Sequence, residues 1–418
     1  MTEGVRTGLA PSATGARTSR ATVVGIALAS ALVPLNSTMV AVALPKLARA
    51  FGIGRGRAGL LVTVYLVVML VGQPIAGRVS DMLGSKRVAV ASLLGFSACS
   101  IGAALSPSFT WLVGWRGTQA VFAAALAPSV QSMLRSVTRP TERSHAFGIL
   151  GSVIGVGAAS GPIIGGLLVG SFGWKAIFVA NVPAAAVALT VLVTVTVNDL
   201  AAETAVSPSV CIGETFDVKV SRSGRSELLR PSFLAALATQ ALANLGQYSL
   251  LLIAPIVLDH RGWGSRQTGL ALSALTVGLI VMGPSGGRFG DRSGNRAAIL
   301  RGLSIGAFGA ALLLPFGISV SPAMLIAALA VFGMGLGFAS SSIIAAGLEA
   351  VPSHQTGVAA GILSASRYVG SIVASVLLAV NVADDGSGGR VMYVAATVAL
   401  LVAVGTSRRL ADRAGSNA

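Results

Sequence analysis

"GRVSDMLGSKR", residues 77 to 87, recurs later in the chain as "GRFGDRSGNR", residues 287 to 296. Both stretches hold glycine, arginine, aspartate, glycine and a basic residue in the same order, although only 11% of the chain is charged. Shifting the sequence by 210 residues aligns the two stretches without a gap, and twelve of the forty positions from 45 to 84 are then identical. The chain therefore carries an internal repeat.

The composition indicates a membrane protein. The mean hydropathy is +0.81 and 54% of the residues are hydrophobic, whereas about a quarter of the residues in a soluble domain are charged. An apolar helix of about 20 residues crosses the hydrocarbon core of a bilayer. The sequence holds twelve such runs, near residues 21–45, 58–77, 87–106, 110–134, 146–170, 176–197, 232–258, 267–287, 297–318, 322–348, 357–381 and 390–407.

The positive charge is distributed unevenly between the loops of this twelve-span arrangement. With both termini on one side, that side takes twenty of the thirty Lys and Arg residues and the opposite side takes eight. Cytoplasmic loops carry the excess of basic residues in membrane proteins. We therefore expect both termini and both charged turns in the cytoplasm of a multi-pass protein of the cell membrane. The net charge of +16 then sets the topology, and no nucleic-acid partner is expected.

The only long polar segment between spans divides the chain into equal numbers of spans. Residues 198–231 carry nine charged residues and no apolar run long enough to cross a membrane. The predicted organisation is an N-terminal half, residues 1–197, a cytoplasmic linker, residues 198–231, and a C-terminal half, residues 232–418. Because six spans separate the two copies of the repeat, the copies have the same orientation in the membrane. Parallel halves around a central path are typical of rocker-type transporters.

Four motifs resemble those of the major facilitator superfamily, and within it the drug/proton antiporters. "GRVSDMLGSK" from residue 77 resembles the signature between helices two and three, and "WRGTQAVFAAA" from residue 115 the signature of helix four. "GAASGPIIGG", residues 157–166, resembles the antiporter signature of helix five, and "LNSTMVAVALP", residues 35–45, the first-helix signature of drug exporters. The resemblance implies an all-α fold of two parallel, pseudo-symmetric six-helix halves. The exporters usually place an aspartate at the second position of the first-helix signature, where this chain has Asn36.

The two charged turns are predicted to form a cytoplasmic gate. The resemblance places Asp81 near the start of the eleventh span, and pseudosymmetry places Asp291 near the start of the fifth, around residues 144–148. A helix N-terminus favours an anion, so the turns are expected to latch the halves together. The alternative is that the turns only fix the topology, with Gly77 and Gly84 giving the backbone its freedom. The gate residues are Gly77, Arg78, Asp81, Gly84, Lys86, Gly287, Arg288, Asp291 and Gly294.

The helix-five signature contributes Gly157, Gly161, Pro162, Gly165 and Gly166. Glycines that recur every four residues allow close helix packing, and a proline removes an intrahelical hydrogen bond. The proline and the last two glycines have no counterpart in the second half, so the sequence favours a direction-specific role over generic packing. The resemblance associates that role with antiport.

Polar residues inside the apolar runs are candidates for a central cavity. A cation at the depth of Arg116 is costly unless it faces water or a partner, and snorkelling to the outer surface is the alternative. Polar residues recur on one face of the seventh span, where they serve either as contacts between helices or as a cavity surface. The predicted cavity residues are Asn36, Thr38, Arg116, Gln119, Gln240, Asn244, Gln247 and Tyr248.

Together these features predict a secondary active transporter that exports small amphiphilic or apolar organic compounds by proton antiport. Import or facilitated passage of one specific metabolite is the alternative. No nucleophile motif, phosphate loop or metal-binding cluster indicates an enzyme, and we expect no cofactor, no metal and a monomer, with protons as the coupling ion. Because Asn36 cannot titrate, coupling would run through Arg116 and water, through Glu349, or through the ionisation of the substrate.

The charge distribution gives a testable topology. Alkaline phosphatase fused to the C-terminus should be inactive, because that enzyme folds only outside the cytoplasm, whereas a fusion after residue 175 should be active. An active C-terminal fusion would contradict the twelve-span arrangement.

Overall fold

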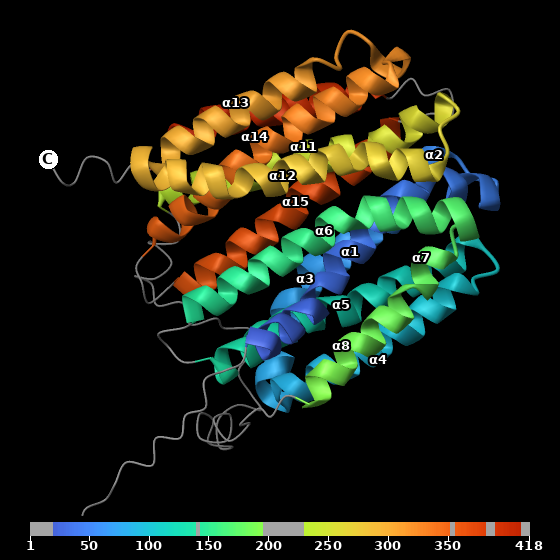
Figure 1. Cartoon of the computed structure of the whole chain (residues 1–418), viewed down its shortest axis with the longest axis vertical. Helices are drawn as coiled ribbons and strands as arrows, with labels where there is room; N and C mark the ends of the chain where they lie inside the picture. Colours follow the sequence, from blue (N-terminus) through green and yellow to red (C-terminus); the bar gives the residue numbers. More distant parts are fainter. Residues whose placement is uncertain (1–19, 139–142, 195–229, 352–355, 382–388, 411–418) are drawn as a thin grey trace, which may run out of the picture.

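The computed structural model describes residues 20–138, 143–194, 230–351, 356–381 and 389–410, and almost all of them are helical (Figure 1). The N-half comprises α1 (Arg20–Phe51), α2 (Arg55–Ala58), α3 (Leu60–Leu83), α4 (Ser85–Ala104), α5 (Phe109–Val137), α6 (Arg143–Phe172), α7 (Ala176–Val179) and α8 (Asn181–Thr194). The C-half comprises α11 (Pro231–His260), α12 (Ser265–Ser293), α13 (Asn295–Ala311), the 3-10 helix η1 (Gly317–Ser319), α14 (Pro322–Glu349), α15 (Thr356–Asn381) and α16 (Gly389–Ser407).

Each of the twelve predicted apolar runs coincides with helix. Eleven helical segments of the described chain are long and apolar enough to cross a membrane. The exception is the ninth run, whose helix α13 has 17 residues, or about 26 Å at 1.5 Å per residue. The chain beyond Ala311 continues in turns, with Leu313 and Leu314 donating to carbonyls three residues back. Pro315 explains this end, because a proline has no N–H for the carbonyl four residues back, here that of Ala311, and its ring clashes with that carbonyl.

The two halves repeat the same packing scheme. In the N-half α1 packs on α6, α3 on α5 and α4 on α5; in the C-half α11 packs on α15, α12 on α14 and α13 on α14. The helices that correspond under the 210-residue shift therefore have corresponding neighbours. In Figure 1 the C-half, yellow to red, lies above the N-half, blue to green. The predicted pseudo-symmetric arrangement of two six-helix halves is confirmed. Most of the predicted linker, residues 198–229, lies outside the described residues.

The charged turns are shorter than the sequence predicted. Helix α3 continues through Gly77, Arg78 and Asp81 to Leu83, so the turn to α4 consists of Gly84 with φ +88°. The second copy repeats this arrangement, with Gly294 at φ +87° between α12 and α13. The expectation that Gly77 gives the turn its freedom is wrong, because Gly77 and its counterpart Gly287 are helical. Only the glycine after the last helical residue needs the left-handed backbone.

The glycines of α6 allow α1 to approach its backbone. A Cβ on Gly157 would lie 2.9 Å from the carbonyl oxygen of Ala31, and a Cβ on Gly165 would lie 2.9 Å from Cα of Met39. A Cβ on Gly161 would collide with the side chain of Thr38. The packing interpretation of this four-residue spacing therefore holds for α1.

Gly166 lies on another face of α6 and meets the C-half. A Cβ there would lie 2.6 Å from the carbonyl oxygen of Ser265 and 2.8 Å from Cα of Gly269, both on α12. Gly269 in turn lies against the carbonyl of Pro162. Residues of the helix-five signature therefore make two close contacts, one with α1 within the N-half and one with α12 of the C-half. The Gly166 contact lies towards the end of the bundle that holds α2 and the last residues of α11, which we call the Asp259 end. The opposite end holds the turns at Gly84 and Gly294, and we call it the terminal end.

The Gly166 contact predicts a specific effect of one methyl group. Gly166→Ala should force α6 away from α12, because backbone atoms cannot move aside as a flexible side chain can. The measurement is thiol labelling of the purified protein with Thr63→Cys, in a background without Cys99 and Cys211. We expect labelling several times faster than in the parent. Gly155→Ala is the matched control, since a Cβ at Gly155 meets nothing within 4 Å, and equal labelling in both variants would contradict the prediction.

Candidate functional site

A buried polar network links four helices of the N-half. Gln119 on α5 donates from Nε2 to Oγ of Ser100 on α4 (2.6 Å) and accepts at Oε1 from Nη1 of Arg116 (2.6 Å). Asn36 on α1 donates from Nδ2 to the same Oε1 (3.4 Å). Asn181, the first residue of α8, donates to Oδ1 of Asn36 (3.1 Å) and to Oγ of Ser100 (3.4 Å). The sequence predicted three members of this network.

Arg116 is buried in the protein rather than extended to the surface. Its side chain is 1% exposed, which excludes the snorkelling alternative for this conformation. Its guanidinium carbon lies 4.0 Å from the ring centroid of Tyr65 on α3, a cation–π distance. Arg116 forms no ion pair with any carboxylate of the described residues. The network therefore holds a buried positive charge among neutral groups.

Three members of this site were missed by sequence reasoning, namely Tyr65, Ser100 and Asn181. All three are buried, at 1%, 0% and 1% exposure. A lone amide in the predicted sixth span was the available signal for Asn181. Nothing in the sequence shows that α1, α4 and α8 bring Asn36, Ser100 and Asn181 together around Gln119, because that depends on the packing of the half.

Thr38 faces α6 rather than the interface between the halves. Its hydroxyl lies 3.1 Å from the carbonyl oxygen of Ala158 on α6 and 3.0 Å from that of Pro34 in its own helix. This hydrogen bond joins α1 to α6 beside the close approach at Gly161.

The polar face of α11 is also largely buried. Gln240 and Asn244 are 8% and 7% exposed, and Asn244 donates to the backbone carbonyl of Gln240 (3.0 Å). Gln247 and Tyr248 are partly buried. Tyr248 packs against the apolar cluster that contains residues of both halves.

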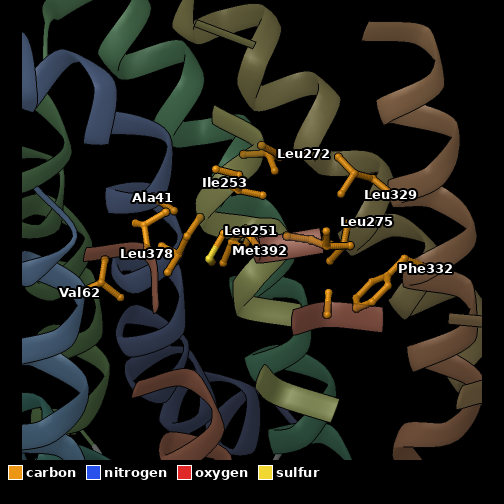
Figure 2. Close-up of a cluster of buried hydrophobic side chains, with 14 of the residues drawn as sticks. Ala41, Val62, Leu251, Ile253, Leu272, Leu275, Leu329, Phe332, Leu378 and Met392 are labelled. Atoms are coloured by element: carbon orange, nitrogen blue, oxygen red, sulfur yellow. The ribbon is translucent and has the colours of Figure 1, made fainter. Parts of the chain in front are cut away.

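Other polar contacts cross the interface towards the middle of the bundle. Thr63 on α3 donates to Oγ of Ser375 on α15 (2.9 Å), and Gln73 on α3 donates to the hydroxyl of Tyr368 on α15 (2.9 Å). Thr276 on α12 donates to the carbonyl of Ala159 on α6 (3.2 Å). The apolar cluster of Figure 2 joins the halves, with Ala41, Val62 and Leu378 side by side.

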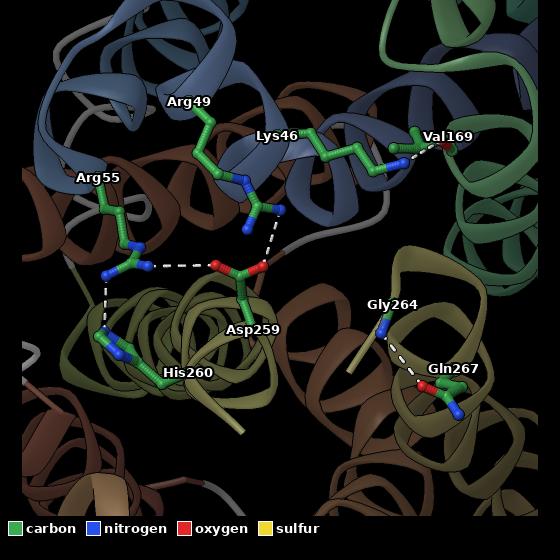
Figure 3. Close-up of polar contacts among 8 residues, drawn as sticks. All are labelled: Lys46, Arg49, Arg55, Val169, Asp259, His260, Gly264 and Gln267. Carbon is green, nitrogen blue, oxygen red and sulfur yellow. Dashed lines mark hydrogen bonds and ion pairs between the residues drawn. The ribbon is translucent and has the colours of Figure 1, made fainter. Parts of the chain in front are cut away.

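An ionic cluster joins the halves at the Asp259 end (Figure 3). Asp259 at the end of α11 accepts from Arg49 of α1 (2.9 Å) and from Arg55 of α2 (3.2 Å). Arg55 also donates to Nε2 of His260 (2.7 Å). The Asp259 side chain is 9% exposed, against 61% for Arg49 and 21% for Arg55. Arg55 lies 204 positions before Asp259 in the sequence, and the sequence analysis did not predict that these residues meet.

The predicted gate residues lie at the terminal end. Asp81 and Asp291 are exposed and make no ion pair or hydrogen bond with any residue that the structure describes. Lys86 donates to the carbonyl of Val193 (3.0 Å) within the N-half. The segments on which the aspartates were expected to dock, residues 352–355 and the side chains of 141–148, lie outside the described part of the chain. The latch therefore stays a prediction.

Comparisons with known proteins agree with this architecture. The family model of the Major Facilitator Superfamily matches residues 26–375. The chain is 31% identical to the MFS-type transporter YvkA of Bacillus subtilis, over 86% of this chain and 89% of that protein, and 26% identical to multidrug resistance protein Stp of Mycobacterium tuberculosis (strain CDC 1551 / Oshkosh), over 87% and 75%. The crystal structure of a bacterial homolog of the human lysosomal transporter Spinster, inward-facing and occupied, superposes with a TM-score of 0.73 at 16% identity, over 92% of this chain and 95% of that chain. The chain belongs to the major facilitator superfamily.

Proposed function

We propose that this transporter exports small amphiphilic or apolar organic compounds from the cell in exchange for protons. The observation that carries the export assignment is the similarity to a multidrug resistance protein over 87% of the chain. The antiporter signature of α6 supports exchange, and the apolar surroundings of the central polar groups suit an amphiphilic compound. No described carboxylate lies in the middle of a span, so the proton step is proposed to use water at Arg116, Glu349 or the substrate itself.

We propose that the present conformation is open to the cytoplasm. The support is an asymmetry between the two ends of the bundle. Ionic, polar and backbone contacts join the halves from the Asp259 end to the middle, whereas Asp81 and Asp291 are exposed at the terminal end. The excess of basic residues assigns the terminal end to the cytoplasm. Alternating access then requires the Asp259 end to open and the terminal end to close, with the aspartates docking as latches in the closed state.

Asp259 has the properties of the gate residue at the outer end in this scheme. It is the single C-half carboxylate for two N-half guanidinium groups, and it is nearly buried in their contact. Replacing Asp259 removes both ionic contacts between the halves at this end, and the exposed guanidinium of Arg49 then returns to water. The contact must break once in each cycle, so its strength sets the balance between the two conformations.

This role predicts that Asp259→Asn shifts the protein towards the outward-open conformation. The measurement is labelling of Thr63→Cys in intact cells by a membrane-impermeant thiol reagent, in the background without native cysteines. We expect several-fold faster labelling, with normal insertion into the membrane.

Arg57→Gln is the control, since Arg57 is exposed on the same short helix as Arg55. Labelling that is equally fast in the control, or unchanged in Asp259→Asn, would remove Asp259 from the gate.

The export assignment is tested with a strain that lacks the transporter and with inverted membrane vesicles. The strain should become sensitive to a subset of a panel of amphiphilic compounds. The vesicles should accumulate those compounds when their interior is acidic, and accumulation should stop when the pH gradient is collapsed. Gly166→Ala should abolish accumulation, whereas Gly155→Ala should keep it. Uptake of a labelled metabolite by intact cells, without any change in sensitivity, would instead support an importer.

A further inference from the structure

The guanidinium of Arg116 has no counter-charge among the residues that the structure describes. Of its three nitrogens, only Nη1 has a hydrogen-bond partner in the described part of the chain, and Nε is buried without one. A charge buried inside a membrane protein is normally paired, because an unpaired one is costly. The stacking on Tyr65 and the oxygen of Gln119 are neutral contacts. The site is therefore one negative charge short.

Two other buried polar atoms near Arg116 also lack partners among the described residues. They are the hydroxyl of Tyr65 and Oδ1 of Asn181. The Tyr65 hydroxyl approaches the amide of Asn36 but makes no hydrogen bond of acceptable geometry with it. Nearly all buried polar groups in folded proteins have partners. Arg116 Nε and the Tyr65 hydroxyl are both hydrogen-bond donors. Each therefore needs an acceptor that the described residues do not supply.

Tyr65 lies near the interface between the halves. Tyr368 of α15 packs against the buried cluster that includes Tyr65, and its hydroxyl accepts from Gln73 of α3. The C-half thus contributes a tyrosine to the surroundings of Tyr65. Transporters built from repeats place substrate sites at the interface between the repeats. A ligand here would contact both halves.

Asn36 explains why the charge is missing. Its Oδ1 accepts from Asn181 and its Nδ2 donates to the glutamine oxygen that also accepts from Arg116. A carboxylate at this position would neutralise Arg116 from within the network. The amide keeps the shape of that carboxylate and removes the charge.

We propose that Arg116 binds a monovalent, carboxylate-like anionic group, with Tyr65 as a second donor. This assignment deepens the proposed function, on which it rests for the direction of transport: the substrates include amphiphilic organic acids. The anionic group pairs with the guanidinium, beside the ring of Tyr65 that stacks on it. A free inorganic anion has the same chemistry at Arg116, so the experiment separates the two sources.

The probes are sodium benzoate, its neutral analogue benzamide, and sodium chloride, added to the purified protein in neutral detergent. The measurement is the melting temperature Tm as a function of probe concentration, at an ionic strength fixed with sodium sulfate, whose anion is divalent and not a carboxylate. Benzoate should raise the Tm of the wild type with a saturable dependence, because a ligand that binds only the folded state stabilises it. Benzamide should not. A comparable rise with chloride identifies an inorganic anion as the ligand, and a rise with benzoate alone identifies an organic acid.

Variants assign the effect to the site. Asn36→Asp supplies the missing charge from within the network. At least tenfold more benzoate should then be needed for the same rise in Tm. Arg116→Gln should abolish it. Arg57→Gln, which removes an exposed arginine at the Asp259 end, should keep it.

The proposal fails if benzoate does not stabilise the wild type, or if it stabilises Asn36→Asp as well as the wild type. The second criterion stands even where Arg116→Gln does not fold. Failure of export in vesicles together with a benzoate effect in detergent would overturn the proposed function and leave the anion site. Export of neutral and cationic compounds without a benzoate effect would overturn only the anion site.

Discussion

The two halves of this transporter meet through backbone at the Asp259 end. Gly166 and Gly269 have no side chains, so α6 and α12 approach until their own main-chain atoms touch. Side chains can change rotamer to relieve a poor fit, but backbone contacts of this kind are either made or lost. The polar contacts Thr63–Ser375 and Thr276–Ala159, and the ionic contacts of Asp259, belong to the same interface. The close approach of the two glycines fixes the distance between α6 and α12 within it.

The fold was largely predictable because hydropathy and repetition are properties of the sequence alone. The twelve apolar runs and the 210-residue shift gave the spans and the parallel halves. The errors arose where local backbone chemistry mattered: Pro315 ends α13 early, and α3 runs through Gly77 to a turn at Gly84. The candidate site was predictable only in part. Arg116, Gln119 and Asn36 were found as polar residues in apolar runs, whereas Asn181 and Asp259 became visible only through partners distant in the sequence.

The two halves have the same arrangement of helices but differ in their buried side chains. The 210-residue shift places Gly246 opposite Asn36 and Leu275 opposite Tyr65. Leu275 belongs to the apolar core of the C-half, where its carbonyl lies against Gly333 of α14. The N-half has thus developed a polar interior at positions where the C-half is packed with apolar side chains or backbone. The N-half therefore holds the charged centre, and the C-half contributes Tyr368 to the surroundings of Tyr65.

The geometry of the Asp259 cluster also makes the closed end sensitive to ionic strength. Arg49 is 61% exposed while its partner Asp259 is only 9% exposed, so dissolved ions reach one side of the pair. The screening length falls from about 30 Å in 0.01 M salt to about 3 Å in 1 M salt. Dilute medium at this end therefore strengthens the contact and concentrated medium weakens it. The ionic strength of the solution at this end therefore influences how firmly the two halves are joined there.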